Sequence, residues 1–265
     1  MTADHLTAVL PAQELIAPAH WRTAELISDL PLDPTEPRTL QAWERYLHTT
    51  ETDAVFMLGD LFEVWVGDDT IDEPDSFEAR ACHILREAST RRPLFFMHGN
   101  RDFLAGPEFL ERSGMTGLQD PTVLVLGEQR ILLSHGDALC LDDVEYQKFR
   151  AISRSPAWIQ HTLQQSLAAR RALGKAMRAQ SQKLKQSGAE YADLDAAATL
   201  QWMDATQTTV FIHGHTHRPA DHALPANALG QARTRVVMSD WHIDAHTHRA
   251  EVLRITPQGW QRLSF

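Results

Sequence analysis

Five short polar segments carry the residues that could do chemistry, and each of them ends a short hydrophobic run. The segments span residues 27–29, 58–60, 98–102, 134–137 and 213–217. Together they supply carboxylates, an amide and imidazoles, which are common ligands of divalent cations. Two such cations about 4 Å apart can clamp the attacking and leaving oxygens of a phosphoryl displacement. The five segments together therefore predict a centre for two metal ions.

Taken singly, most of the candidate ligands have a simpler explanation. Asp29 could be a turn or helix-cap residue, Asn100 after a glycine could belong to a plain turn, and His135 could be a buried core histidine. The fifth segment is different because it holds three histidines in five residues, which packing does not readily explain. His215 and His217 are one residue apart, so both point to the same side of an extended segment. The number and order of the segments therefore carry the prediction.

Asp60 and Arg101 add two specific capabilities. Asp60 follows Gly59, whose missing side chain lets the backbone and a metal approach closely, and its central place in the order makes it the candidate bridge between two cations. Arg101 offers a planar fork that matches phosphate oxygens. No serine or cysteine sits in a nucleophile motif. The expected reaction is attack by a metal-activated water on phosphorus, with Arg101 stabilising the charge on the oxygens.

The hydrophobic runs have the pattern of buried β-strands, and helical spacing fills most of the stretches between them. Strands are predicted at 24–27, 54–58, 94–97, 131–133 and 209–212, and helices at 38–49, 76–90 and 108–113, the last stopping at Gly114. A hairpin is expected at 123–133, with later strands at 234–238, 249–255 and 260–265. The alternation predicts a layered α/β body that gathers the ligands at the strand ends. A helical insertion is expected between the fourth and fifth segments.

Composition favours one domain with an insertion over two domains, because the chain has 265 residues and is 43% hydrophobic. Cys82 and Cys140 lie far apart in no metal-binding pattern, so we expect reduced thiols in a cytosolic setting. We find no secretory signal and no apolar run near 20 residues, so a membrane-spanning protein is not expected. Residues 1–20 are expected to form an extension ahead of the first strand.

Charge is distributed unevenly along the chain. Residues 145–187 hold nine basic residues and one acidic residue, although the chain has a formal net charge of −10. Apolar residues recur there at helical spacing, namely Trp158, Ile159, Leu163, Leu167, Leu173, Ala176 and Met177. Two interpretations remain open: a helix pair packed on the body with a solvated basic face, or a module that grips a lipid or an anionic membrane surface. Nucleic-acid binding ranks last because aromatic side chains for base stacking are sparse.

These motifs resemble those of the calcineurin-like metallophosphoesterase superfamily, most closely its UDP-2,3-diacylglucosamine pyrophosphatases of lipid A synthesis. The matching stretches are GDLFE at 59–63, HGNRDFL at 98–104, HGD at 135–137 and HGHTHRP at 213–219. The resemblance implies an αββα sandwich over residues 21–265 with a helical lid inserted at about 145–205. It also implies hydrolysis of UDP-2,3-diacylglucosamine to UMP and 2,3-diacylglucosamine 1-phosphate (lipid X). The enzyme would be cytoplasmic and peripheral on the inner face of the bacterial inner membrane, and would need no protein partner and no nucleic acid.

The resemblance also implies a role for individual residues. One Mn²⁺ would be held by Asp29, Asp60 and His217, and a second by Asp60, Asn100, His135 and His215. The catalytic residues would be Asp60, Asn100, Arg101 and His215. The substrate contacts would be Asn100, Arg101, Asp143, Ser181, Lys185 and His215.

This chain departs from the family pattern at positions that affect the site. The family has a histidine two residues after the first aspartate, and Pro31 stands there. Proline offers no donor atom, so the first metal site is expected to be weakened unless Asp33 or water compensates. Lys185 and Gly188 replace the family's asparagine and lysine beyond Ser181, and Lys185 would supply charge by a different route. The alternatives are another phosphoesterase, against which the lid argues, and a metal-impaired lipid-binding relative, which Pro31 keeps open.

Overall fold

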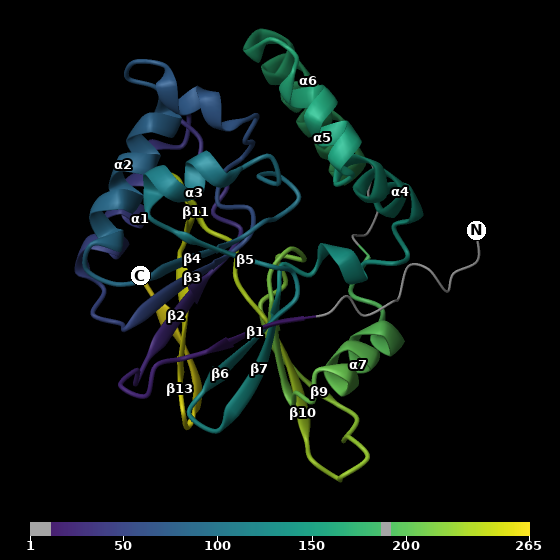
Figure 1. Cartoon of the computed structure of the whole chain (residues 1–265). Helices are drawn as coiled ribbons and strands as arrows, with labels where there is room; N and C mark the ends of the chain where they lie inside the picture. The colour runs from purple at the N-terminus through teal and green to yellow at the C-terminus, as the bar shows by residue number, and fades with distance from the viewer. Residues whose placement is uncertain (1–11, 187–191) are drawn as a thin grey trace.

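The computed structural model describes residues 12–186 and 192–265, and shows two six-stranded β-sheets packed face to face (Figure 1). The first sheet has the order β14-β13-β2-β3-β4-β5. Its strands are β2 (Ala24–Ile27), β3 (Ala54–Leu58), β4 (Leu94–Met97), β5 (Thr116–Leu118), β13 (Glu251–Thr256) and β14 (Gly259–Ser264). Strands β2 to β5 are parallel, and β13 and β14 extend the sheet in antiparallel pairing.

The second sheet has the order β1-β6-β7-β8-β10-β9. Its strands are β1 (Gln13–Ile16), β6 (Thr122–Leu126), β7 (Gln129–Ser134), β8 (Val210–His213), β9 (Ala220–Leu224) and β10 (Arg233–Val237). Strand β1 comes from the N-terminal extension and pairs in parallel with β6. Strands β6 and β7 form the predicted hairpin, and β7, β8 and β10 run parallel. A separate small ribbon joins β11 (His242–Ile243) and β12 (His248–Arg249).

Helices cover the outer faces of both sheets (Figure 1). Helices α1 (Pro37–Thr49), α2 (Phe77–Ser89) and α3 (Pro107–Ser113) lie on the first sheet, and α7 (Ala196–Ala205) lies on the second. The described residues also form the short 3₁₀ helices η2 (Asp68–Asp72) and η3 (Asp137–Leu139). Helix α3 ends at Gly114, whose φ of 70° is the left-handed conformation that glycine adopts readily at helix ends. The helix stop predicted there is confirmed.

Strand β3 shows why the central strands are hydrophobic throughout. Val55 and Met57 pack under the helices of the first sheet, whereas Phe56 and Leu58 pack into the layer between the sheets. On the far side of the second sheet, Trp202 of α7 packs in a third cluster. Because both faces of these strands are covered, their sequences are continuous hydrophobic runs rather than alternating ones. The predicted αββα sandwich is confirmed.

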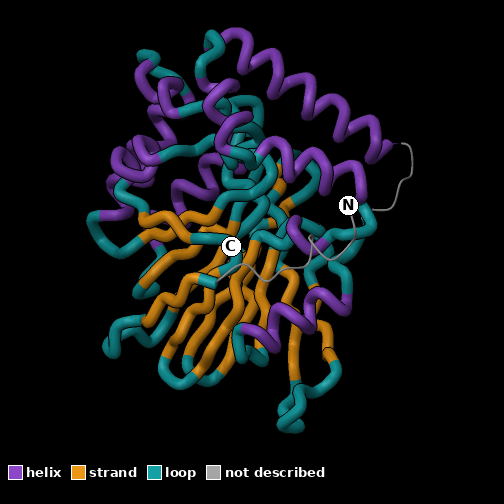
Figure 2. Tube along the Cα trace, turned by 45° about the vertical axis from the view of Figure 1, so that its right-hand side comes forward, coloured by secondary structure: helices purple, strands orange, loops and turns teal. Residues whose placement is uncertain are grey.

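Three helices project together beyond the sandwich: α4 (Val144–Ser153), α5 (Pro156–Leu163) and α6 (Leu167–Gln186) (Figures 1 and 2). We call these three helices the lid. They follow β7 and precede β8 in the chain, where the sequence predicts a helical insertion. Trp158 and Ile159 of α5 pack against the hydrophobic cluster of the first sheet, where the ring of Trp158 lies 5.9 Å from that of Phe103, so the middle helix of the lid contacts the body. Helix α7, near the end of the predicted insertion, packs on the second sheet instead.

Candidate metal centre

The ends of five strands bring the candidate ligands to one end of the sandwich. Asp29 and Asp60 follow β2 and β3 of the first sheet, and Asn100 follows the neighbouring strand β4. His135 follows β7 of the second sheet, and His215 follows its parallel neighbour β8. Because these strands point the same way within each sheet, their carboxyl ends form one edge.

Four of the candidate ligands have a left-handed backbone. The φ angles are 56° at Asp29, 53° at Asp60, 68° at His215 and 54° at His217. This conformation costs a residue with a side chain roughly 1 kcal/mol or more, and it persists where the surroundings hold it in place. Such strain often marks functional sites, and here it falls on residues that the sequence singles out for metal binding.

Two glycines permit the close approach of the ligand segments. Gly59 has a φ of 86°, and a Cβ atom there would lie only 2.5 Å from Nδ1 of His135. A Cβ atom at Gly99 would collide with the carboxylate of Asp60. Any larger residue at either position would push the strand ends apart, so both glycines are required by the site.

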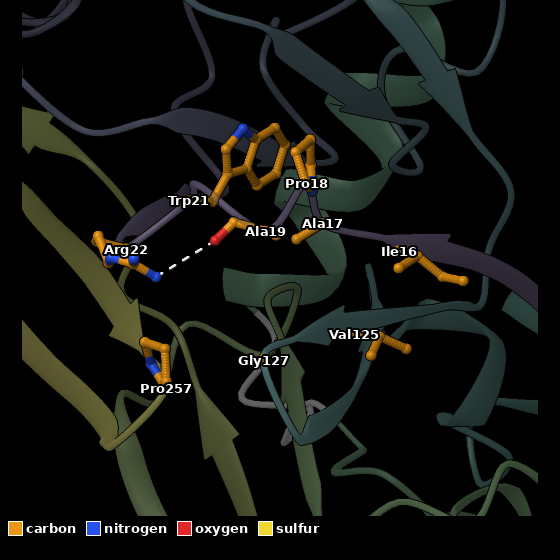
Figure 3. Close-up of a pocket in the computed structure, with 9 residues that line it drawn as sticks. All are labelled: Ile16, Ala17, Pro18, Ala19, Trp21, Arg22, Val125, Gly127 and Pro257. Atoms are coloured by element: carbon orange, nitrogen blue, oxygen red, sulfur yellow. Dashed lines mark hydrogen bonds between the residues drawn. The ribbon is translucent and has the colours of Figure 1, made fainter.

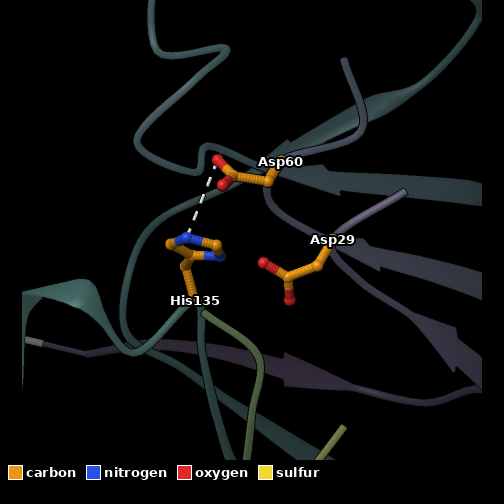
Figure 4. Close-up of side chains that lie close together, drawn as sticks. All are labelled: Asp29, Asp60 and His135. Atoms are coloured by element: carbon orange, nitrogen blue, oxygen red, sulfur yellow. Dashed lines mark ion pairs between the residues drawn. The ribbon is translucent and has the colours of Figure 1, made fainter. Parts of the chain in front are cut away.

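Asp29, Asp60 and His135 form the middle of the site (Figure 4). Each offers one ligand atom, and these atoms lie within 4.8 Å of one another. The three residues are almost fully buried, and Nε2 of His135 is 3.7 Å from Oδ1 of Asp60. Oδ1 of Asp29 accepts no hydrogen bond among the described residues, although the ring of His217 lies 3.3 Å away. A buried carboxylate oxygen that accepts no hydrogen bond is a position that a cation can fill.

Asn100 joins two histidines to this group. Its Oδ1 atom is 3.1 Å from Nε2 of His135 and 2.9 Å from Nδ1 of His215. The two imidazole rings have centroids 5.1 Å apart. The geometry therefore brings together Asn100, His135 and His215, which the family resemblance assigns with Asp60 to the second metal.

His217 lies between two carboxylates. Its Nε2 atom is 3.3 Å from Oδ1 of Asp29, and its Nδ1 atom is 3.4 Å from Oδ2 of Asp240. Asp240 also accepts a hydrogen bond of 2.6 Å from Arg249. Asp240 was not predicted as a site residue, although its position just after the predicted strand 234–238 repeats the pattern of the other candidate ligands. Carboxylates that orient a metal-binding histidine through its other nitrogen are common around metal sites.

Electrostatic contacts set the pKa values of the three histidines. Burial lowers the pKa of His135, but the carboxylates of Asp60 and Asp29 outweigh it and raise the pKa to about 9. Burial also opposes the charge of His217, but its carboxylate partners raise the pKa to about 9. The pKa of His215 is lowered to about 4 by burial and by the neighbouring His135. A cation must displace protons from His135 and His217, so its binding weakens as the pH falls.

The donor set fits divalent cations. Carboxylate and amide oxygens together with imidazole nitrogens suit ions such as Mn²⁺, Zn²⁺ and Fe²⁺. The donors form two groups. One group is Asp29 and His217, and the other is Asn100, His135 and His215. Asp60 lies close to a member of each group, Asp29 in the first and His135 in the second. This is the distribution that two neighbouring cations with one shared carboxylate require.

Compensation by Asp33, one of the two alternatives that the sequence left open, has no geometric support. Its Oδ1 atom accepts a 2.8 Å hydrogen bond from the backbone of Thr35, as in an ordinary turn. Across residues 12–186 and 192–265, the group of side chains close enough to share a cation includes Asp29 but not Asp33. His217, whose Nε2 atom is 3.3 Å from Oδ1 of Asp29, is therefore the candidate nitrogen ligand in place of the residue that Pro31 replaces.

Arg101 lies beside Asp60 with most of its side chain buried. Its backbone N–H donates to Oδ1 of Asp60 at 2.9 Å, and its Nε–H donates to Oδ2 at 3.0 Å. Its Nη1 atom donates to Glu63. No hydrogen bond in the described part of the chain engages Nη2. Asp60 and Glu63 thus bind Arg101 on two sides, and its Nη2 atom can donate to another acceptor.

The remaining predicted substrate contacts have different outcomes. The carboxylate of Asp143 accepts a 3.0 Å hydrogen bond from the backbone of Tyr146, so Asp143 caps helix α4. Ser181 and Lys185 belong to the last turns of α6, and their side chains lie outside the described structure. Their contacts with substrate, and that of Asp143, stay predictions.

Asp137 anchors the first lid helix to the site, a role that the sequence analysis missed. It is fully buried and accepts hydrogen bonds from the hydroxyl of Tyr146 and from Nε of Arg150, while Arg154 lies 3.5 Å away. The ring of Tyr146 stacks on His215, with centroids 6.0 Å apart and planes 29° apart. The same short segment therefore carries a metal-ligand candidate and the anchor of α4.

Most basic residues of the lid pair with acidic residues of this chain. The pairs are Lys148–Glu145, Arg150–Asp137, Arg154–Asp137, Arg170–Asp69, Arg171–Glu73 and Arg178–Glu63. Arg170 is only 4% exposed, so it is not available to a membrane surface. The basic residues of the lid thus serve largely to bind the lid to acidic residues of the body. Their number is therefore weaker support for an anionic partner.

A separate pocket of about 500 Å³ lies at the other end of the sandwich (Figure 3). Its lining residues are Ile16, Ala17, Pro18, Ala19, Trp21, Arg22, Val125, Gly127 and Pro257. Gly127 precedes β7 whereas His135 follows it, so the strand separates this pocket from the metal centre. Its one charged residue, Arg22, donates to the carbonyl of Ala19 at 3.3 Å. The pocket therefore takes no part in the site.

Comparison with known families agrees with this geometry. The calcineurin-like phosphoesterase family matches residues 26–219, which include all the candidate metal ligands. The chain therefore belongs to the calcineurin-like phosphoesterase family and is a hydrolase of that family.

Individual bacterial relatives of this chain carry a more specific name than the family does. The chain is 41% identical to a UDP-2,3-diacylglucosamine hydrolase of Stenotrophomonas maltophilia over 249 residues, which cover 90% of this chain and 96% of that protein. It is 43% identical to the hydrolase of the same name from Xanthomonas campestris, over 89% of this chain and 96% of the relative. It is 44% identical to the hydrolase of this name from Chromobacterium violaceum, over 82% of this chain and 89% of the relative. Within the class, this chain is a member of the same family as these hydrolases.

Proposed function

We propose that this protein hydrolyses the pyrophosphate bond of UDP-2,3-diacylglucosamine to give UMP and 2,3-diacylglucosamine 1-phosphate, with two Mn²⁺ ions as cofactors. The names of the similar bacterial hydrolases support this substrate. The observation that carries the proposal is the buried cluster of Asp29, Asp60 and His135, with Asn100 at its edge and Arg101 beside it. A cluster of metal donors next to a phosphate-binding fork suits hydrolysis of a phosphate anhydride.

The proposed ligands of one cation are Asp29, Asp60 and His217, and those of the other are Asp60, Asn100, His135 and His215. When bound, such a pair acidifies a water molecule and neutralises charge on the phosphate oxygens. The protein itself fixes the positions of these donors, through the strained backbone at the strand ends and through hydrogen bonds to the ligands.

The substrate phosphates would meet Arg101, Asn100 and His215. Arg101 keeps Nη2 for a phosphate oxygen, because Asp60 and Glu63 occupy its other two positions. Asn100 turns Oδ1 toward the histidines, which leaves its amide N–H₂ as a donor. Donors that are already in place stabilise the charge that develops during the attack on phosphorus.

A covalent route through a cysteine has no support. Cys82 and Cys140 are both buried, and burial raises the pKa of the Cys82 thiol to about 11 and that of Cys140 further. A thiol with such a pKa is a poor nucleophile at neutral pH. Water therefore remains the attacking group.

We further propose that the lid holds the acyl chains and contacts the inner face of the bacterial inner membrane, in the cytoplasm. Val144 and Ile152 of α4 are 54% and 58% exposed, and Leu163 of α5 is 41% exposed. These exposed apolar side chains are stronger support for contact with lipid than the lid arginines, which are paired with acidic residues. No helix in the described residues has the length and hydrophobicity to cross a bilayer.

Three lid residues complete the proposed substrate contacts. Asp143 begins helix α4, while Ser181 and Lys185 belong to the end of α6. Positions at the two ends of the lid suit contact with the sugar and the nucleotide of a long substrate. Alanine variants of Ser181 and Lys185 should raise KM for UDP-2,3-diacylglucosamine with little change in kcat.

The direct test uses metal-stripped protein and UDP-2,3-diacylglucosamine in detergent. Chromatography measures the release of UMP. This release should be absent from the stripped protein and in the presence of a chelator, and Mn²⁺ should restore it. Asp60→Asn should lower kcat by at least about a hundredfold, because it weakens the binding of both cations and the hydrogen bonds that position Arg101. Activity that survives chelation would refute the metal mechanism. Hydrolysis of simple phosphodiesters, but not of this substrate, would indicate a different phosphoesterase.

A further inference from the structure

Glu63 connects the phosphate-binding arginine to the lid. One of its oxygens, Oε2, accepts from Nη1 of Arg101, and the other, Oε1, accepts from Nε of Arg178 at 2.8 Å. The three side chains are mostly buried, with exposures of 23% for Glu63, 8% for Arg101 and 16% for Arg178. One carboxylate is therefore shared between the catalytic edge and helix α6, in a place where water screens little.

The backbone around Glu63 is fixed on both sides. Its own N–H donates to the carbonyl of Leu32 at 3.0 Å, and the N–H of Trp65 donates to the carbonyl of Arg101 at 3.1 Å. The loop that carries Glu63 is thus tied to the segment that carries Arg101. Glu63 can change partners by rotating its side chain, but its backbone has little freedom to leave the site.

Helix α6 is seated directly on this loop. A Cβ atom at Gly174 would lie 2.9 Å from a methyl group of Val64, so the helix and the loop are in close contact. Arg170 pairs through two nitrogens with Asp69 and also donates to the carbonyl of Val66 at 2.6 Å. Arg178 lies two turns further along the same helix. Its distance from Glu63 therefore depends on α6 being in place.

We propose that Glu63 is a positioning residue through which the lid controls Arg101. With α6 seated, Arg178 occupies one oxygen of Glu63, and only the other oxygen reaches Arg101. Nη2 of Arg101 then stays available for a phosphate oxygen of the substrate. When α6 lifts, both oxygens of Glu63 become free to grip Nη1 and Nη2 of Arg101 together, which is the preferred geometry of an arginine–carboxylate pair. The arginine then has no terminal nitrogen left for phosphate.

This inference rests on the proposed function and makes a specific prediction for combined variants. Arg178→Gln should raise KM and lower kcat/KM by about tenfold or more, because a charged hydrogen bond to phosphate is lost when Glu63 captures Arg101. The double variant Glu63→Gln with Arg178→Gln should recover most of that loss, since a neutral amide does not compete for Arg101. Arg171→Gln is the matched control, because it breaks another lid pair, to Glu73, on the same helix. It should stay within about twofold of the starting protein.

Recovery in the double variant supports the proposal, and losses that add up in the double variant overturn it. A second measurement does not need the substrate. The Nε–Hε signal of Arg101 in ¹⁵N NMR should shift in Arg178→Gln and return in the double variant, and an unchanged signal overturns the proposal. If the protein fails to hydrolyse UDP-2,3-diacylglucosamine, the proposed function fails, and the NMR result still decides the role of Glu63.

Discussion

Replacing Asp240 by asparagine should weaken metal binding at the His217 position without disturbing the fold. In the structure, His217 presents Nε2 to Asp29 and Nδ1 to Asp240, at 3.3 and 3.4 Å. A metal held by Nε2 requires Nδ1 to carry the proton and to donate it, and Asp240 is the acceptor in place. Asparagine keeps the shape but removes the charge that fixes this tautomer.

The size of the effect follows from burial and from Pro31. The carboxylate of Asp240 is only 11% exposed, so solvent screens its contact with His217 weakly. Loss of such an orienting partner typically lowers metal affinity by about 10- to 100-fold, which corresponds to roughly 1.4 to 2.7 kcal/mol. We expect the upper half of this range, because Pro31 leaves His217 as the nitrogen ligand on which the site around Asp29 depends.

Calorimetric titration of metal-stripped protein with Mn²⁺ measures this directly. The Asp240→Asn variant should lose affinity in one binding step and keep the other. Asp244→Asn is the matched control, because Asp244 also contacts a histidine ring, His242, at 3.0 Å, but outside the site. Two unchanged binding steps in Asp240→Asn would refute the reasoning. A loss of both steps together with a lower melting temperature would show that Asp240 acts on the fold instead.

Three further outcomes are expected. Pro31→His should raise Mn²⁺ affinity by about tenfold or more, because it adds an imidazole donor next to the first site; an equal affinity would mean that another group already completes it. Since the pKa values of His135 and His217 are raised to about 9, the stability that their protonation gives to the metal-free protein is full below pH 6.5 and is lost as the pH rises toward 9. Mn²⁺ affinity should rise over the same interval, and equal affinities at pH 6 and pH 8 would contradict this. Arg170→Gln should lower the free energy of unfolding by roughly 2 kcal/mol, because it removes a buried hydrogen bond to the carbonyl of Val66 and a half-exposed ion pair with Asp69; urea denaturation measures the change, and a shift below about 0.5 kcal/mol would contradict it.

Local patterns were sufficient to predict the layers of the fold. The continuous hydrophobic runs before Asp29 and Asp60 predict strands covered on both faces, and β2 and β3 are such strands. The stop at Gly114 follows from the preference of glycine for a left-handed cap. The candidate ligands were likewise singled out by their place after each strand. Strand β1 escaped prediction, because a strand of four residues at a sheet edge has a weak pattern.

The contacts that organise the site could not be predicted in the same way. Glu63 and Arg178 are 115 residues apart, and Arg170 and Asp69 are 101 residues apart. Nothing in the spacing of charges says which acidic side chain a basic helix will meet. The count of lysines and arginines therefore suggested a surface open to anionic partners, whereas folding uses most of these charges internally.

Strand β1 has a consequence for the solution behaviour of the protein. It covers the outer edge of β6 with a full set of parallel pairings from Gln13–Thr122 to Ile16–Val125. A bare strand of this kind offers its backbone N–H and C=O groups to any other extended chain, and exposed edges promote aggregation for that reason. Shortened forms that lack residues 1–17 should therefore self-associate as their concentration rises, even though the catalytic end of the molecule is untouched.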